Sequence, residues 1–301
     1  MDESPPTRAA AARATLLVTL AACGFGAIAI LVTVATRTGA PLMTLLSGRY
    51  LLGAVILGAI AGAARQLRLD APAARVLVYG GIGQVLISVV SLSALRYIPA
   101  ATLSFLFYTY PAWVAVITRV RHSEPLTPTR LFALGLSLAG IFVMVGAPGS
   151  AALHPAGVAL ALTAALLYAA YIPMIGALER GLPPIATATY MSAGAAIVLL
   201  IAGAVIGDIT IELHRTAWTA IVLLAIVSTV GAFLGFLRGL RVLGPVRTAI
   251  VSTVEPFFTA VMGAWLLDQP WTVTTLIGGA LIAAAVILLQ IRPANSRFGN
   301  G

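Results

Sequence analysis

Two charged residues interrupt long apolar segments of this chain, and their chemistry raises the first question about function. Arg49 lies within the apolar segment 42 to 63, and Glu255 lies within the segment 247 to 267. A charge inside a membrane helix costs on the order of 3 kcal/mol, so by default it faces a wet cavity or a partner and marks a functional site. Glu255 can therefore bind a proton or a substrate amine, and Arg49 can bind a substrate carboxylate or balance Glu255.

Both residues also have a structural interpretation. Arg49 can extend its side chain to the outer headgroup layer, and Glu255 can hydrogen-bond its neighbours as a packing element. At about 1.5 Å per residue, Glu255 lies a third to half of the way along its segment, and Arg49 lies a comparable distance from the opposite surface. The sequence leaves open whether the two side chains approach each other.

Two prolines occupy matching positions in the middle of apolar segments. Pro111 directly follows Tyr110, and Pro256 directly follows Glu255. A proline within a helix removes a backbone donor and frees a carbonyl, which in a transporter can face the cavity. We therefore predict a hinge or gate at both prolines, with a static kink as the alternative, and we count Tyr110 with Glu255 as a site residue.

A pair of tyrosines adds a second candidate surface. Tyr168 and Tyr171 are three residues apart, so they share one face of a helix. Tyrosine hydroxyls in a membrane interior need polar partners. The pair can line a cavity for an amphipathic or aromatic substrate, whereas the other aromatic side chains are expected mostly to pack or to face lipid.

The chain has no lysine, because all 18 basic residues are arginine. A Walker A loop, a pyridoxal Schiff base and a retinal Schiff base each need a lysine, which excludes an ATP-driven pump and a retinal protein. His122, His154 and His214 lie in three separate loops, and metal-binding and nucleophile-elbow motifs are absent from the sequence. We therefore expect no enzymatic activity, no cofactor and no metal.

Composition identifies the elements that must position these residues. Of 301 residues, 60% are hydrophobic and 9% are charged, whereas a soluble domain has about 25% charged residues. The sequence thus predicts an all-α polytopic membrane protein, since a span needs about 20 apolar residues. Ten segments qualify: 14 to 36, 42 to 63, 76 to 95, 99 to 118, 130 to 147, 156 to 177, 185 to 206, 217 to 238, 247 to 267 and 272 to 291.

The placement of arginine predicts the orientation. The net charge of +9 comes from single arginines between apolar segments, so it reflects membrane topology and does not indicate a nucleic-acid partner. With a cytoplasmic N-terminus, 14 arginines fall on the inside, Arg37, Arg96 and Arg215 fall outside, and Arg49 lies within a segment. This asymmetry predicts ten spans with both termini cytoplasmic.

One stretch of the chain occurs twice, 145 positions apart. The offset pairs Leu92 with Leu237, Arg96 with Arg241, Pro111 with Pro256, Pro125 with Pro270 and Thr127 with Thr272. Each half holds five predicted spans, and an odd number of crossings makes the second half enter from the opposite side. The sequence therefore predicts inverted repeats, with a substrate site near the bilayer midplane between the halves.

This repeat predicts the domain organisation. We expect an N-terminal tail at 1–13, a first five-helix repeat at 14–147, an external linker at 148–155, a second repeat at 156–291 and a C-terminal tail at 292–301.

Glycines at helical spacing predict close packing of helices within the bundle, with homodimerisation as the alternative. They are Gly58 and Gly62 in the second span and Gly231, Gly235 and Gly239 in the eighth.

Several short motifs, in this order and spacing, resemble the EamA-type branch of the drug/metabolite transporter superfamily. In the first half they are Leu95-Arg96-Tyr97-Ile98-Pro99, Tyr108-Thr109-Tyr110-Pro111 and Glu124-Pro125-Leu126-Thr127, and in the second they are Leu243-Gly244-Pro245, Glu255-Pro256 and Asp268-Gln269-Pro270. The resemblance implies a bacterial inner-membrane protein with two five-helix repeats that moves amino acids, other small metabolites or toxic compounds by alternating access. The small multidrug pumps of the superfamily carry a proton-binding acid in the first span, whereas this chain has Ala22-Cys23-Gly24-Phe25-Gly26 there.

Together these features predict a secondary transporter of small organic metabolites, with export as the expected direction. Its expected partners are a small-molecule substrate, possible protons and the lipid bilayer, and it is expected to be a monomer or a homodimer. A membrane receptor or scaffold subunit that does not transport is the alternative.

Overall fold

The computed structural model describes residues 8–68, 70–122, 128–146, 153–270 and 272–291, and this part of the chain is helical without strands. Its first-half elements are α1 (Arg8–Thr36), α2 (Leu42–Ala63), α3 (Ala71–Arg75), the π-helix η1 (Val76–Gly80), α4 (Gly81–Ser93), the 3-10 turn η2 (Ala94–Arg96), α5 (Ala100–Phe107), α6 (Tyr110–His122) and α7 (Pro128–Gly146). Its second-half elements are α8 (Pro155–Leu178), α9 (Pro184–Ile206), α10 (Arg215–Leu223), the π-helix η3 (Leu224–Gly231), α11 (Ala232–Ser252), α12 (Val254–Leu267) and α13 (Val273–Ile291).

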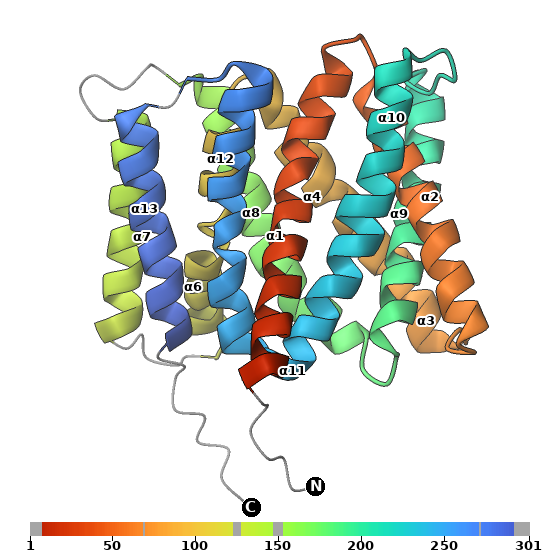
Figure 1. Ribbon diagram of the computed structural model, residues 1–301, viewed down its shortest axis with the longest axis horizontal. Helices are drawn as coiled ribbons and strands as arrows, with labels where there is room; N and C mark the ends of the chain where they lie inside the picture. The colour runs from red at the N-terminus through yellow and green to blue at the C-terminus, as the bar shows by residue number, and fades with distance from the viewer. Residues whose placement is uncertain (1–7, 69, 123–127, 147–152, 271, 292–301) are drawn as a thin grey trace, which may run out of the picture.

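The helices form one elongated bundle, and both described ends of the chain lie at the same end of it. Figure 1 shows that α1 starts and α13 finishes at the lower end of the bundle. We call this the termini end and the opposite one the far end. Two helix ends on one side are compatible with an even number of crossings, and the orientation of the termini stays a prediction.

Six helical stretches are long and apolar enough to cross a membrane, and three shorter apolar helices accompany them. The six are Arg8–Thr36, Leu42–Ala63, Ala71–Arg96, Pro155–Leu178, Pro184–Ile206 and Arg215–Leu240, and the shorter ones are Leu131–Val143, Val254–Leu267 and Val273–Leu288. These lengths support a polytopic α-helical membrane protein. The count of ten spans stays a prediction, partly because helix breaks divide the predicted spans 99 to 118 and 247 to 267.

Some element boundaries differ from those predicted. α11 continues through residues 238–247, which we expected to form a connection on the inside. Gly244-Pro245 is the only turn signal there, and a single proline can kink a helix without ending it. α1 starts at Arg8, six residues early, because the helix-forming run Ala9–Ala12 extends it. The predicted tail at 292–301, residues 1–7 and most of the 148–155 linker lie outside the described residues.

The packing of the helices repeats itself between the two halves. α2 packs on α9 and α7 packs on α13, so elements that the 145-residue offset pairs also contact each other. Likewise α1 contacts α11 and α12, while its counterpart α8 contacts α4, α5 and α6. Such reciprocal contacts are the pattern of an approximate two-fold axis between the halves, and they support the predicted inverted repeat.

Glycines allow the closest helix contacts of this bundle, although not all at the predicted positions. A Cβ atom added to Gly81 would lie 2.6 Å from the Gly194 carbonyl carbon, so the backbones of α4 and α9 touch there. Of the predicted glycines, Gly235 and Gly239 lie against α1, where Cβ atoms would approach Leu17 and Ala14 carbonyl oxygens at 3.3 and 3.1 Å.

The other three predicted glycines make no tight contact with another helix. A Cβ at Gly58 would make an ordinary 3.5 Å contact with Thr189 of α9, and one at Gly62 would meet Leu67 at 3.8 Å. Gly231 is exposed, and its nearest neighbour is a carbonyl of its own segment, Ile226. The tightest backbone contacts are therefore those of Gly194 with the Leu77 carbonyl oxygen and of Gly81 with Gly194.

Candidate functional site

The candidate site lies where two predicted spans are each divided into two shorter helices. α5 ends at Phe107 and α6 begins at Tyr110, whereas α11 ends at Ser252 and α12 begins at Val254. Phe107 and Ser252 are 145 positions apart, which is the spacing of the repeat. Discontinuous helices are a recurrent feature of transporter sites, because helix ends leave backbone groups free to face a cavity.

A proline follows each break and leaves one carbonyl without its helical partner. Pro111 and Pro256 have no backbone N–H, so they cannot donate to the carbonyls four residues earlier, those of Phe107 and Ser252. The Ser252 carbonyl oxygen instead lies 2.8 Å from the hydroxyl oxygen of Tyr108, which donates to it. A side chain of the first half thus satisfies the backbone of the second.

Glu255 meets the same hydroxyl group. Its Oε2 lies 2.8 Å from Tyr108 Oη, and Tyr108 is the residue at which α5 ends. Glu255 is also in the first turn of α12, where the N-terminal end of the helix dipole favours a carboxylate. The carboxyl group is therefore held at the contact between the two helix breaks. Within the described residues, no group of three or more His, Cys, Asp or Glu side chains could hold a metal ion.

Aromatic rings surround this contact on the first-half side and on α8. The Tyr110 ring packs edge to face on the Tyr168 ring with 4.8 Å between centroids, and Phe107 lies 5.2 Å from Tyr168. The Tyr108 and Tyr110 rings are 6.0 Å apart. The hydroxyls of Tyr110 and Tyr168 make no hydrogen bond within the part of the chain that the structure describes, so they are open to water or to a ligand.

Tyr171 has a different position from its neighbour Tyr168, although their rings lie 6.5 Å apart. It is buried, and its hydroxyl donates to the carbonyl of Gly80, the last residue of the π-helix η1, at 2.9 Å. π-Helical turns widen a helix and expose carbonyls, and they are frequent at functional sites. Tyr171 thus joins α8 to the widened turn of the third predicted span.

Arg49 forms a separate polar centre and does not reach the surface. Its side chain is 6% exposed, its Nε donates to Thr229 Oγ1 at 3.0 Å, and its guanidinium lies 4.9 Å from the centre of the Tyr50 ring. Thr229 in turn donates to the Leu224 carbonyl in the π-helix η3. These contacts rule out the headgroup position for this structure, and among the described residues no ion pair joins Arg49 to Glu255.

A polar network beside Arg49 was not anticipated from the sequence. The Tyr50 hydroxyl lies 2.7 Å from Ser88 Oγ, and Gln84 donates its amide to the Tyr50 hydroxyl at 2.9 Å. Gln84 and Ser88 are four residues apart, so they form one polar face on an otherwise apolar helix. This four-residue spacing of polar side chains was the sequence feature from which the network could have been predicted. Tyr108 was not predicted as a site residue, because only the fold shows that its hydroxyl lies beside Glu255.

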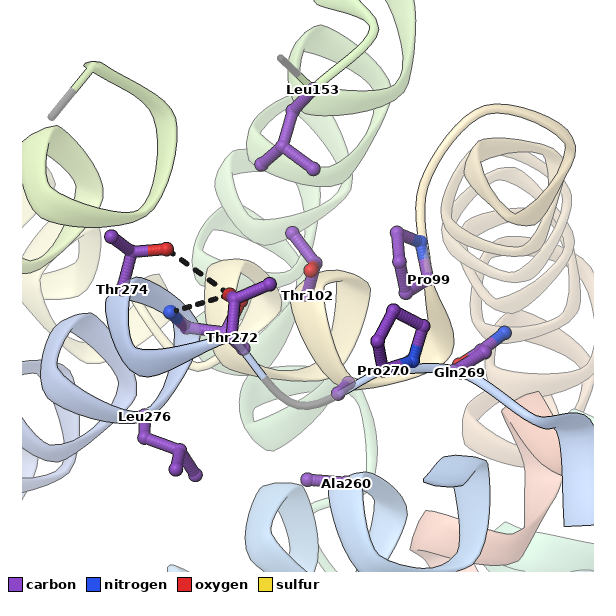
Figure 2. Close-up of a pocket in the computed structure, with 11 residues that line it drawn as sticks. Pro99, Thr102, Leu153, Ala260, Gln269, Pro270, Thr272, Thr274 and Leu276 are labelled. Carbon is purple, nitrogen blue, oxygen red and sulfur yellow. Dashed lines mark hydrogen bonds between the residues drawn. The ribbon is translucent and has the colours of Figure 1, made fainter. Parts of the chain in front are cut away.

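A small cavity lies toward the far end, beside α12. Its volume is about 80 Å³, and Figure 2 shows Pro99, Thr102, Gln269 and Thr272 at its wall with Ala260 below. Ala260 is one and a half helical turns beyond Glu255, or about 7 Å along α12. A cavity of this size holds a few waters and is too small for a metabolite. This cavity is therefore not a metabolite-sized binding site.

Side chains from both halves hold that end together. Arg37 at the end of α1 donates to the carbonyl of Leu267 at 3.0 Å, and the backbone N–H of Ala100 donates to Oε1 of Gln269 at 3.1 Å. Discontinuous helices with a carboxyl group between them are a feature of the binding sites of many transporter folds.

Sequence comparison agrees with this geometry. The sequence matches the EamA-like transporter family over residues 12–146 and again over residues 155–291. The chain belongs to the EamA-like transporter family. The two matched regions confirm the two-repeat organisation that the motifs indicated, and the EamA family is one of membrane transporters and not of enzymes.

One solved structure supports the EamA fold as a whole. A crystallised chain described only as "Crystal structure of protein" matches with a TM-score of 0.66 and 20% identity, over 93% of this chain and 97% of that one. At this identity the likeness concerns the fold alone. No match was found among curated proteins.

Proposed function

We propose that this EamA protein is a secondary transporter that exports small organic metabolites, amino acids or related or toxic compounds, by alternating access and without ATP. The observation that carries the proposal is the placement of Glu255 between two discontinuous helices of opposite halves. A carboxylate there can bind a proton or an amine at the interface about which the halves would rock. The predicted small-molecule substrate and proton partners thus share one site.

The surroundings of Glu255 favour an amphipathic substrate. Tyr110 and Tyr168 present ring faces and hydroxyls without protein partners in the described chain, so a ligand with both an apolar part and a polar group would satisfy them. Arg49 and the Tyr50–Gln84–Ser88 network offer a second polar centre in the bundle, which suits a substrate carboxylate.

The same proposal includes the membrane setting. We place the protein in a bacterial inner membrane with ten spans in two inverted repeats and with its termini in the cytoplasm. The arginine distribution and the common location of both chain ends support this arrangement.

The function is tested by identifying what crosses the membrane. Metabolite profiling of medium from cells that overexpress the protein and from deletion cells should show one class of amphipathic compound accumulating outside. The purified protein in liposomes should then move that compound down its gradient. Ligand binding without flux above empty vesicles, in any gradient, would instead support the receptor or scaffold alternative.

The role of Glu255 is tested by Glu255→Gln, which keeps the size but removes the titrating group. Loss of a charge-assisted hydrogen bond is worth about 1.5 to 3 kcal/mol, so we expect the flux to fall about 10- to 100-fold and to lose its pH dependence. The matched control is Glu212→Gln, since Glu212 is an exposed loop residue. Wild-type flux and pH profile in Glu255→Gln would remove Glu255 from the mechanism.

A further inference from the structure

The hydroxyl of Tyr108 has two acceptors but a single hydrogen. The Ser252 carbonyl oxygen and Oε2 of Glu255 each lie 2.8 Å from Tyr108 Oη. A carbonyl only accepts, and an ionised carboxylate only accepts, whereas a protonated carboxyl also donates. With Glu255 ionised, the two oxygens therefore compete for one hydrogen. With Glu255 protonated, every group can be satisfied.

We propose that the Tyr108 hydroxyl changes its hydrogen-bond acceptor with the protonation state of Glu255 and so couples that state to the contact between the two helix breaks. The proton is then the coupling ion of this transporter. This inference rests on the proposed function. When Glu255 is protonated, it donates to Tyr108 Oη, and Tyr108 donates to the Ser252 carbonyl. The end of α5 is then hydrogen-bonded to the end of α11, and the two halves are held together at their breaks.

Loss of the proton reverses this arrangement. The proton leaves to water. The ionised carboxylate then accepts the hydrogen bond of the Tyr108 hydroxyl, and the Ser252 carbonyl oxygen loses its donor. Pro256 has no N–H to offer that carbonyl, so the helix cannot compensate. An unpaired carbonyl in an apolar interior is costly, which favours a rearrangement that brings water or a substrate donor to it. Deprotonation thus loosens the contact between the breaks.

The groups around Glu255 leave Tyr108 as its direct hydrogen-bond partner. Besides Tyr108 of α5, the titratable groups close enough to sense its charge are Cys23 of α1, Tyr110 of α6 and Tyr168 of α8. No arginine or other cation among the described residues forms an ion pair with Glu255. A change in the protonation of Glu255 therefore acts on its surroundings through the hydrogen bond to Tyr108 and not through a salt bridge.

The test uses Trp113, three residues after the start of α6, as a native reporter of the first break. Its indole nitrogen is buried and makes no hydrogen bond within the described chain. Trp218, Trp265 and Trp271 are replaced by phenylalanine, and the full-length protein is titrated in lipid nanodiscs over roughly pH 5 to 9. We expect a single sigmoidal change in Trp113 fluorescence as Glu255 loses its proton.

Three variants decide the inference. Tyr108→Phe keeps the ring and should lose the pH-dependent change. Glu255→Gln should also lose it and remain at the low-pH value, because its amide donates permanently to Tyr108 Oη as the protonated acid does. Tyr190→Phe is the matched control and should keep the change, since it also removes a buried, hydrogen-bonded hydroxyl but one that bonds to the backbone of Arg68.

The outcomes separate the inference from the proposed function. A transition that persists unchanged in Tyr108→Phe, or a Glu255→Gln protein that stays at the high-pH value, would overturn the inference even if flux is robust. A transition that follows the expected pattern in a protein without flux would instead overturn the proposed transport function. Size-exclusion profiles of all variants establish that each is folded before it is titrated.

Discussion

At the scale of single residues, the two intramembrane charges belong to different centres. Glu255 bonds to Tyr108 at the helix breaks, whereas Arg49 bonds to Thr229 and lies over Tyr50. Each charge is thus stabilised by neutral hydroxyl and aromatic partners, without a counter-ion among the described residues. Buried charges held in this way remain free to attract an ion or a ligand of opposite sign.

A prediction at this scale concerns Arg49. Arg49→Met keeps the apolar stem but removes the guanidinium, and Thr229 keeps its hydrogen bond to the Leu224 carbonyl, so the fold should survive. We expect flux to fall about 10- to 100-fold through loss of a charge-assisted contact. Arg49→Lys should also be impaired, because an ammonium cannot reproduce the planar guanidinium contacts.

The measurement is flux in liposomes at matched protein content. Arg215→Met is the control, since Arg215 is an exposed residue at the start of α10. If Arg49→Met transports like the wild type, Arg49 is a packing residue despite its burial.

At the scale of helices, irregularities of the backbone recur in both halves. The breaks after Phe107 and Ser252 coincide under the 145-residue offset, and π-helical turns occur in both the third and the eighth predicted spans. Each π-helix has a carbonyl that accepts a side-chain donor, Gly80 from Tyr171 and Leu224 from Thr229. Irregular backbone in a membrane protein is tolerated where such partners or a cavity satisfy it.

A prediction at this scale concerns the close approach of α4 and α9. In Gly81→Ala the new methyl group would meet the backbone at Gly194, which cannot move aside as a side chain can. We expect a loss of stability of about 1 to 3 kcal/mol from this overpacking. Gly58→Ala is the control, because its methyl group would make an ordinary 3.5 Å contact and alanine favours helix.

The stability of both variants is measured as the temperature at which the protein in detergent loses its monodisperse size-exclusion peak. The glycine contact is unimportant if Gly81→Ala is as stable as Gly58→Ala.

At the scale of the whole molecule, hydrogen bonds join the two halves at one end of the bundle. Contacts between the halves at the far end join Arg37 to the Leu267 carbonyl and Ala100 to Gln269, and the cavity there is about 80 Å³. Transport by alternating access would have to break these contacts in every cycle.

A prediction at this scale concerns a cross-link that holds the two halves together at the far end. Ala100→Cys with Gln269→Cys, in a Cys23→Ala background, is treated with a short methanethiosulfonate cross-linker that dithiothreitol cleaves. We expect flux to stop and to recover after reduction, because the far end can no longer open. Each single-cysteine variant, treated in the same way, is the control. Undiminished flux in the cross-linked protein would exclude an opening between these two residues.

The sequence alone determined much of this protein. Long apolar segments of about 20 residues identified a helical membrane protein, because a helix satisfies its own backbone hydrogen bonds in lipid and needs about that length to cross. The 145-residue repeat identified two related halves, which the two family matches confirm. The cost of charge in an apolar segment pointed to Arg49 and Glu255, since a charged residue within such a segment is visible without knowledge of its neighbours in space.

The tertiary structure decided which groups meet. Local spacing specifies neighbours on one helix, whereas the bond from Tyr108 to Glu255 joins residues 147 positions apart, and that from Arg49 to Thr229 joins residues 180 apart. Such contacts depend on how helices of opposite halves pack, which no local pattern encodes. Helix packing therefore placed the two charges in separate centres. It also placed Tyr108, which no spacing distinguishes in the sequence, between the Glu255 carboxyl group and the Ser252 carbonyl that Pro256 leaves without a helical donor.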